Sequence, residues 1–372
     1  MAVIDIVNAL TRNGYDQAYR EMINILNSKR KNILVLIDTI NEYDLRDIKV
    51  VLCVKALITV CFQYYNTTAL THLYLKISIP SEIHTHLFEL LPEKQQGNTV
   101  VIQWKNNDLL KMIAMRMLYW SKKDDSGLMQ FHSKFEYSDF YDDNPLSTEN
   151  AKKILHEFLP DTCPTSLSYS FDTLAYTIRH TLKKPRELMS IFNSFIAMIY
   201  EKRNLKFFIE NPDEIRNVIH STQEGMISGA LSMYSKSYPN IINVCEVVLE
   251  RKKYILQGSE FDKALKEVFS YNLAYNVDDI KRILLESGLI GKINEISCLH
   301  PKSAGIEEHI RLIKAKFEYQ VKGKLSLNKD DFYVLHPMCY EHFQCVVGTA
   351  TLVYPDQFES ESDIIKSLRL KQ

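Results

Sequence analysis

The stretch that most constrains the fold runs from Ile33 to Asp44 and reads I-L-V-L-I-D-T-I-N-E-Y-D. Five apolar residues, three of them β-branched, end at the carboxylate of Asp38. A short, continuous apolar run of this kind predicts a strand buried on both faces of a parallel sheet. An acid at the carboxyl end of such a strand lies where open α/β sheets bind ligands. The alternative is a core strand whose Asp38 only caps the helix that follows.

The segments around this stretch alternate between apolar runs and amphipathic patterns. Two further strands are expected, at Leu73–Ile79, which Pro80 ends, and at Thr99–Trp104. Helices are expected over residues 3–28, 44–65, about 81–91 and 108–120. This alternation predicts a parallel sheet with crossover helices, although three strands make only a small sheet.

The rest of the chain changes character twice. Residues 121–148 mix Ser, Asp, Lys, Phe and Tyr without a period and predict an irregular insertion. Helices are then expected over residues 148–158, 170–182, 185–202, 211–236, 238–254, 259–269 and 277–287. Strand Ile310–Tyr319 is expected to turn at Lys322-Gly323-Lys324 into Leu325–Leu327, and Tyr340–Val347 to close the domain. Helices followed by a β-hairpin are the pattern of a winged helix, and the tail from Tyr354 is expected to be loose.

Composition excludes several classes of protein. The formal net charge is −1, so no overall field directs the chain to nucleic acid or to a membrane surface. The longest apolar run, Val50–Phe62, is too short to span a bilayer and contains Lys55. Seven cysteines without a C-x-x-C pair indicate reduced thiols in a cytoplasmic protein. Cys339 and Cys345 lie near two histidines, but their spacing matches no usual zinc pattern.

The most informative motif is one that the sequence lacks. No G-x-x-x-x-G-K-[ST] occurs; Gly-Lys appears only at Gly291-Lys292 and Gly323-Lys324, without the earlier glycine. That loop supplies the backbone N–H groups and the lysine that hold the β- and γ-phosphates of a nucleotide. The sequence therefore predicts weak nucleotide binding or none.

Two further positions are candidates for binding. Ser78 or Ser81, at the end of the second strand, could contact a phosphate, although Ser81 could equally cap the next helix. Arg186 lies in the first turn of the helix that Pro185 begins, where the helix dipole does not favour a cation. Such an arginine indicates an external anion; the alternative is a solvated side chain or one paired with a carboxylate.

These motifs together resemble a known family. The run I-L-V-L-I-D-T-I-N-E-Y resembles the Walker B motif of STAND-type and AAA-like P-loop ATPases. The segments K-I-S-I-P-S-E-I-H, N-T-V-V-I-Q-W-K-N-N-D-L-L-K-M-I-A-M-R-M, K-K-P-R-E-L and L-H-P-M-C-Y follow in an order similar to that of one bacterial family of such ATPases. The similarity covers most of residues 20–345, and order and spacing carry it more than any single motif.

The resemblance implies a role for individual residues. It implies Asp38 as the acid on the Mg²⁺ side, Ser78 as a residue like sensor 1, and Arg186 as an arginine like sensor 2 on a helical lid. Mg²⁺ and ATP enter as cofactors only through this resemblance. Two departures matter: Asn41 stands where an acid usually activates water, with Glu42 as a neighbouring substitute, and the family's phosphate loop would lie upstream of the first residue.

The expected organisation is α/β plus α, with a partial P-loop-like parallel sheet, a helical lid and a C-terminal winged-helix-like domain. The expected parts are a core (1–120), an insertion (121–148), a lid (149–258), a winged domain (259–347) and a tail (348–372). This predicts a truncated or degenerate ATPase without hydrolysis as a single chain, acting as an interaction or regulatory module. A sheet that lacks a strand would expose an apolar edge and favour a protein partner or a homo-oligomer.

The alternative is a DNA-binding protein that uses the winged domain, with phosphate contacts that make binding depend on salt. The basic bias of this region comes from Lys281, Arg282, Lys292, Lys302, Arg311, Lys314, Lys316, Lys322 and Lys324.

Overall fold

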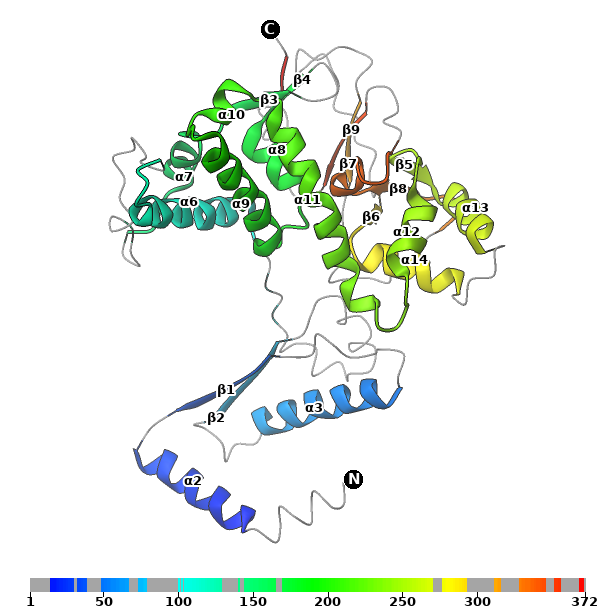
Figure 1. Cartoon of the computed structure of the whole chain (residues 1–372). Helices are drawn as coiled ribbons and strands as arrows, with labels where there is room; N and C mark the ends of the chain where they lie inside the picture. Colours follow the sequence, from blue (N-terminus) through cyan, green and yellow to red (C-terminus); the bar gives the residue numbers. More distant parts are fainter. Residues whose placement is uncertain are drawn as a thin grey trace. The chain divides into compact units, whose positions relative to one another are not determined.

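The computed structural model (Figure 1) separates the chain into two compact units, residues 1–100 and 101–372. The residues it describes are 14–29, 32–38, 48–66, 73–78, 100, 102, 104–128, 140, 144–164, 169–269, 276–292, 311–315, 328–345, 351–355 and 368–370. The expected helix around 81–91 and the first part of the expected helix over 3–28 lie outside these residues. Each unit is described by itself below.

The first unit contains a parallel pair of strands joined through a helix, as the sequence predicts. Its elements are α2 (Tyr15–Lys29), β1 (Ile33–Asp38), α3 (Ile48–Asn66) and β2 (Leu73–Ser78). β1 and β2 pair in parallel, from Ile33 opposite Leu73 to Asp38 opposite Ser78. Helix α3 lies beside the strands (Figure 1) and buries Val54, Ile58 and Cys61. This is a crossover unit, because parallel neighbours cannot be joined by a tight turn.

The expectation that β1 is buried on both faces is wrong. Leu34, Val35 and Leu36 are 52%, 37% and 67% exposed, because β1 pairs with β2 alone among the described residues. The strand expected over 99–104 is also not found at the positions that can be checked. Val100 and Ile102 belong to no strand and are 85% and 86% exposed. Strong β propensity does not form a strand where no neighbour offers its backbone.

The second unit begins with helices whose apolar residues recur every three or four positions. Its helices up to residue 249 are α6 (Asn106–Lys123), α7 (Thr148–Leu155), α8 (Thr173–Arg179), α9 (Pro185–Lys202), α10 (Phe207–Glu210), α11 (Glu214–Leu231) and α12 (Ile241–Leu249). In α9, Pro185 occupies the first turn, and the spacing of Leu188, Ile191, Phe195 and Ile199 places them on one buried face. Helix α6 contacts α7 and α9 and belongs to the second unit, which begins at Val101.

The last large element of the second unit is a small antiparallel sheet covered by helices. Its parts are β5 (Ile255–Gln257), α13 (Gly258–Phe269), α14 (Val277–Glu286), β6 (Ile290–Lys292) and β8 (Phe332–Leu335). The strand order is β5-β8-β6, with both pairs antiparallel. The central strand, β8, buries Tyr333, Val334 and Leu335 completely. Figure 1 shows α12, α13 and α14 gathered beside these strands.

Two strand pairings in the last third were not predicted, and the expectation of a loose tail is wrong at residues 368–370. Strand β7 (Arg311–Ala315) pairs in parallel with β9 (Thr351–Pro355). The tail carries β10 (Leu368–Leu370), which pairs with β4 (Tyr169–Asp172) in a sheet of order β10-β4-β3; β3 is Thr162–Pro164. The expected closing segment from Tyr340 begins in turns after a 3₁₀ turn at Pro337–Cys339. The proposed turn at 322–324 and the arm at 325–327 lie outside the described residues.

Candidate functional site

The carboxyl ends of β1 and β2 bring two of the predicted site residues together. Asp38 and Ser78 end their strands as direct partners in the parallel register. Cross-strand partners point to the same face of a sheet, so the carboxylate and the hydroxyl share one face at this edge. Both residues are exposed. The crossover through α3 produces this juxtaposition, because it returns the chain to the same edge of the sheet.

This pair fits part of a magnesium site. Mg²⁺ requires six oxygen ligands and commonly takes one or two carboxylates, with water and substrate phosphates in the other positions. Asp38 could supply the carboxylate and Ser78 a hydroxyl, which leaves most positions to water or phosphate. No group of three or more His, Cys, Asp or Glu side chains that could hold a metal ion occurs among the described residues. Asn41, Glu42 and Ser81 lie outside that part of the chain.

Arg186 lies in the second unit, on the exposed side of the first turn of α9. Its neighbour Glu187 is engaged, because a carboxylate oxygen of Glu187 accepts a hydrogen bond from the backbone N–H of Leu182 at 2.6 Å. Within the described residues, the guanidinium of Arg186 has no ion pair or hydrogen bond. It is therefore available to an anion. Asp38 and Arg186 belong to different units.

A cluster of buried polar side chains in the second unit was missed by the sequence reasoning. Arg179, at the end of α8, is only 7% exposed, and its guanidinium lies 5.5 Å from the ring centroid of Phe171. Burial, followed by the charge of Arg179, lowers the pKa of His336 to about 3. The same two causes, in the same order, hold the pKa of His180 well below its ordinary value. Both histidines are neutral beside a buried cation.

The segment after β8 ties this cluster to the helices. His336 accepts a hydrogen bond at Nδ1 from the backbone N–H of Met338 at 3.1 Å, which caps the 3₁₀ turn. The next residues then form two histidine–carboxylate pairs. Glu341 lies 3.6 Å from His220 of α11, and His342 lies 3.2 Å from Glu246 of α12.

These contacts make residues 336–345 a joint between the small sheet and the helices. The backbone N–H of His342 also donates to the side-chain oxygen of Gln223 at 3.2 Å, and Gln223 is 1% exposed. Cys339 and Cys345 lie in this segment as buried free thiols. The motif L-H-P-M-C-Y was the sequence signal that could have identified this segment. The segment packs between the small sheet and the helices, because its polar groups are directed at the protein interior.

In the part of the chain that the structure describes, no helix combines the length and the apolar character needed to cross a membrane.

Comparisons with known proteins provide no assignment beyond this geometry. No protein-family model matches the chain, and no match was found among curated proteins or among solved structures.

Proposed function

We propose that this protein is a degenerate STAND/AAA-like P-loop ATPase that acts as an interaction or regulatory module and does not hydrolyse ATP as a single chain. The observation that carries the proposal is the pairing of Asp38 with Ser78 at the carboxyl ends of two parallel strands. A Walker B acid and a neighbouring sensor residue require this placement. The sequence contains no phosphate loop to complete the nucleotide site.

The second unit supports the same proposal. The helices from α7 to α12, which lie between residues 148 and 249, fit the lid expected over 149–258, and Arg186 lies exposed at the start of α9. The succession α13, α14, β6, β8, with its antiparallel sheet, fits a winged helix, in which a helix pair is followed by antiparallel strands. The six cysteines described are all free thiols, as expected in the cytoplasm.

The contacts of α14 favour a packing role for this winged-helix-like part over DNA binding. In a helix-turn-helix the second helix reads the major groove with its N-terminal residues. Here the cations of that helix are engaged: Lys281 pairs with Asp262 at 2.6 Å, and Arg282 lies 3.4 Å from Asp279. The side chain of Asp278, in the first turn, is 82% exposed. An exposed carboxylate there would repel the DNA backbone.

An interaction role also fits the first unit. Leu34 and Leu36 alternate along β1 and are both more than half exposed. Parallel sheets normally bury both faces, so these side chains are suited to contact with another chain.

The nucleotide side of the proposal is tested with Mg·ATP and two forms of the full chain, wild type and Asp38→Asn. Calorimetric titration is expected to show no binding that differs between the two forms, and phosphate release is expected to stay at the rate without protein, because no loop holds the β- and γ-phosphates beside Asp38. Asp38→Asn keeps the size of the side chain and removes its charge. Hydrolysis by the wild type that disappears in this variant would contradict the proposed loss of activity and would assign Asp38 to a working site.

A further inference from the structure

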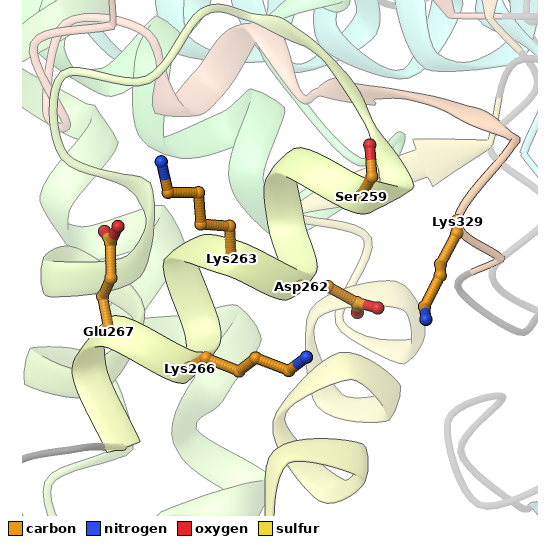
Figure 2. A pocket seen from close by; sticks show the side chains of 6 residues that line it. All are labelled: Ser259, Asp262, Lys263, Lys266, Glu267 and Lys329. Carbon is orange, nitrogen blue, oxygen red and sulfur yellow. The ribbon is translucent and has the colours of Figure 1, made fainter.

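Helix α13 borders a cavity of about 570 Å³ in the second unit. Its lining residues come from the helix and from the segment that precedes β8: Ser259, Asp262, Lys263, Lys266, Glu267 and Lys329 (Figure 2). The volume lies within the range of pockets that hold small molecules. Three of the lining side chains are lysines.

A close backbone approach builds this cavity. A Cβ atom on Gly258 would clash with the carbonyl oxygen of Asn328, so only glycine lets the two segments meet here. The backbone N–H groups of Gly258 and Ser259 donate to the carbonyl oxygens of Asp331 and Lys329 at 2.9 and 3.1 Å. These bonds satisfy the first donors of the helix with protein groups and fix Lys329 beside α13. A ligand in the cavity would therefore be held by the side chains around it and not by the N–H groups at the start of the helix.

The charges around the cavity leave a positive excess. Asp262 is engaged by Lys281 at 2.6 Å, with side chains 13% and 18% exposed. Lys281 also lies 3.7 Å from the exposed carboxylate of Asp278. Lys266 and Lys329 extend toward the same side of α13 as Asp262, as Figure 2 shows. Neither ammonium group has an ion pair among the described residues. Lys263 and Glu267 flank the other side and offset each other in charge.

We propose that this cavity binds a compact phosphorylated anion through Lys266 and Lys329. Two lysines that have no ion pair within the described part of the chain match the charge of a phosphate or a short oligophosphate, and lysine binds phosphate as a mobile point charge. Duplex DNA fits less well, because it requires an extended positive surface and the adjacent α14 presents Asp278. The site shares no residue with the Asp38–Ser78 edge and does not depend on the proposed function.

The test is a titration of the full chain with inorganic pyrophosphate, followed by calorimetry at low ionic strength. The wild type is expected to bind saturably, and binding is expected to weaken as salt is added. Lys266→Gln and Lys329→Gln should each weaken binding by about fivefold, as expected for one exposed charge contact, and the double variant should weaken it further. Lys153→Gln, on the exposed face of α7, is the matched control and should bind as the wild type does.

A second measurement needs no variant. Pyrophosphate should protect Lys266 and Lys329 of the wild type from an amine-modifying reagent and leave Lys153 unprotected, as read by peptide mass spectrometry. A nucleoside triphosphate bound at the same lysines as tightly as inorganic triphosphate supports recognition of the phosphates alone; tighter binding of the nucleotide supports a nucleotide source. The proposal is overturned if pyrophosphate does not bind saturably, or if the double variant binds it with the same affinity as the wild type. It is also overturned if duplex DNA protects these lysines at a lower concentration than pyrophosphate or triphosphate does.

Discussion

Gly258 begins α13 with its backbone packed against residues 328–331. Replacing it with alanine would place a methyl group on the carbonyl of Asn328, so one of the two segments must move. We expect Gly258→Ala to lower the free energy of unfolding by about 1–3 kcal/mol, the usual cost of overpacking, measured by urea denaturation. Gly225→Ala is the matched control, because nothing lies near a Cβ there. Because Gly225 lies within α11, Gly225→Ala should raise the free energy of unfolding by about 0.5–1 kcal/mol. Equal destabilisation by both variants would contradict the close approach of Gly258 to Asn328.

His336 makes stability depend on pH in a definite direction. Burial and Arg179 lower its folded-state pKa to about 3, from an ordinary value of 6.5. As the pH falls through 6.5, unfolded chains bind a proton that the folded chain does not, so stability is present above 6.5 and is lost toward 3. We expect the free energy of unfolding to fall by about 1.4 kcal/mol per pH unit for this histidine. His180 acts in the same sense.

Denaturation at a series of pH values from about 7 to about 5, above the range in which carboxylates titrate, measures this slope. His336→Gln should reduce the slope of the free energy of unfolding against pH, whatever the substitution does to stability at neutral pH. A slope that His336→Gln leaves unchanged would show that His336 is not the group that resists protonation.

The sequence identifies some of these residues and not others, for a physical reason. Asp38 and Ser78 could be anticipated, because each ends an apolar run and parallel strands end at one edge. Arg179 could not. It lies in a stretch expected to be one helix, 170–182, that the structure divides into β4 and α8. Which polar residue of a short helix becomes buried depends on the elements packed around it, and here those include residues 336–345.

Between elements, one ion pair joins α13 to α14. Lys281 and Asp262 lie 2.6 Å apart with side chains 18% and 13% exposed. Removing one partner leaves the other charge poorly solvated, so we expect Lys281→Met to destabilise the fold by about 1–3 kcal/mol. The double variant Asp262→Asn/Lys281→Met should lose less than the sum of the single variants. Lys202 and Glu201 form an exposed pair at 2.8 Å, and Lys202→Met should leave the free energy of unfolding nearly unchanged, because water already solvates both charges. Additive effects at the inner pair would contradict the coupling.

Helices and strands differed in how far local sequence determined them. Helix α9 matches its expected range, Pro185–Lys202, because proline fixes its start and apolar spacing fixes its buried face. Strands depend on partners distant in the chain. β7 was expected but not its pairing with β9, and β10 was not expected at all, since its partner β4 lies almost 200 residues earlier. Nothing local in these short segments specifies such pairings.

At the scale of the whole molecule, the two units differ in how well they bury apolar side chains. The second unit has a continuous core from Leu109 to Cys345. In the first, Leu34 and Leu36 remain 52% and 67% exposed at alternate positions of β1, which places them on one face. Water around such a face is released when another chain covers it. We therefore expect the full chain to associate as its concentration rises, through this face of β1.

Light scattering after size exclusion, over a series of loading concentrations, measures the association. The wild-type mass should rise above the 43.3 kDa of one chain, and Leu36→Lys should return it toward that value, because an ammonium group on the covered face would lose its hydration. Ile25→Lys alters an equally exposed apolar residue on α2, 54% exposed, and should leave the association unchanged. A wild type that stays at the mass of one chain would remove the case for an interaction role of this unit. Association that Leu36→Lys does not weaken would move the contact away from β1.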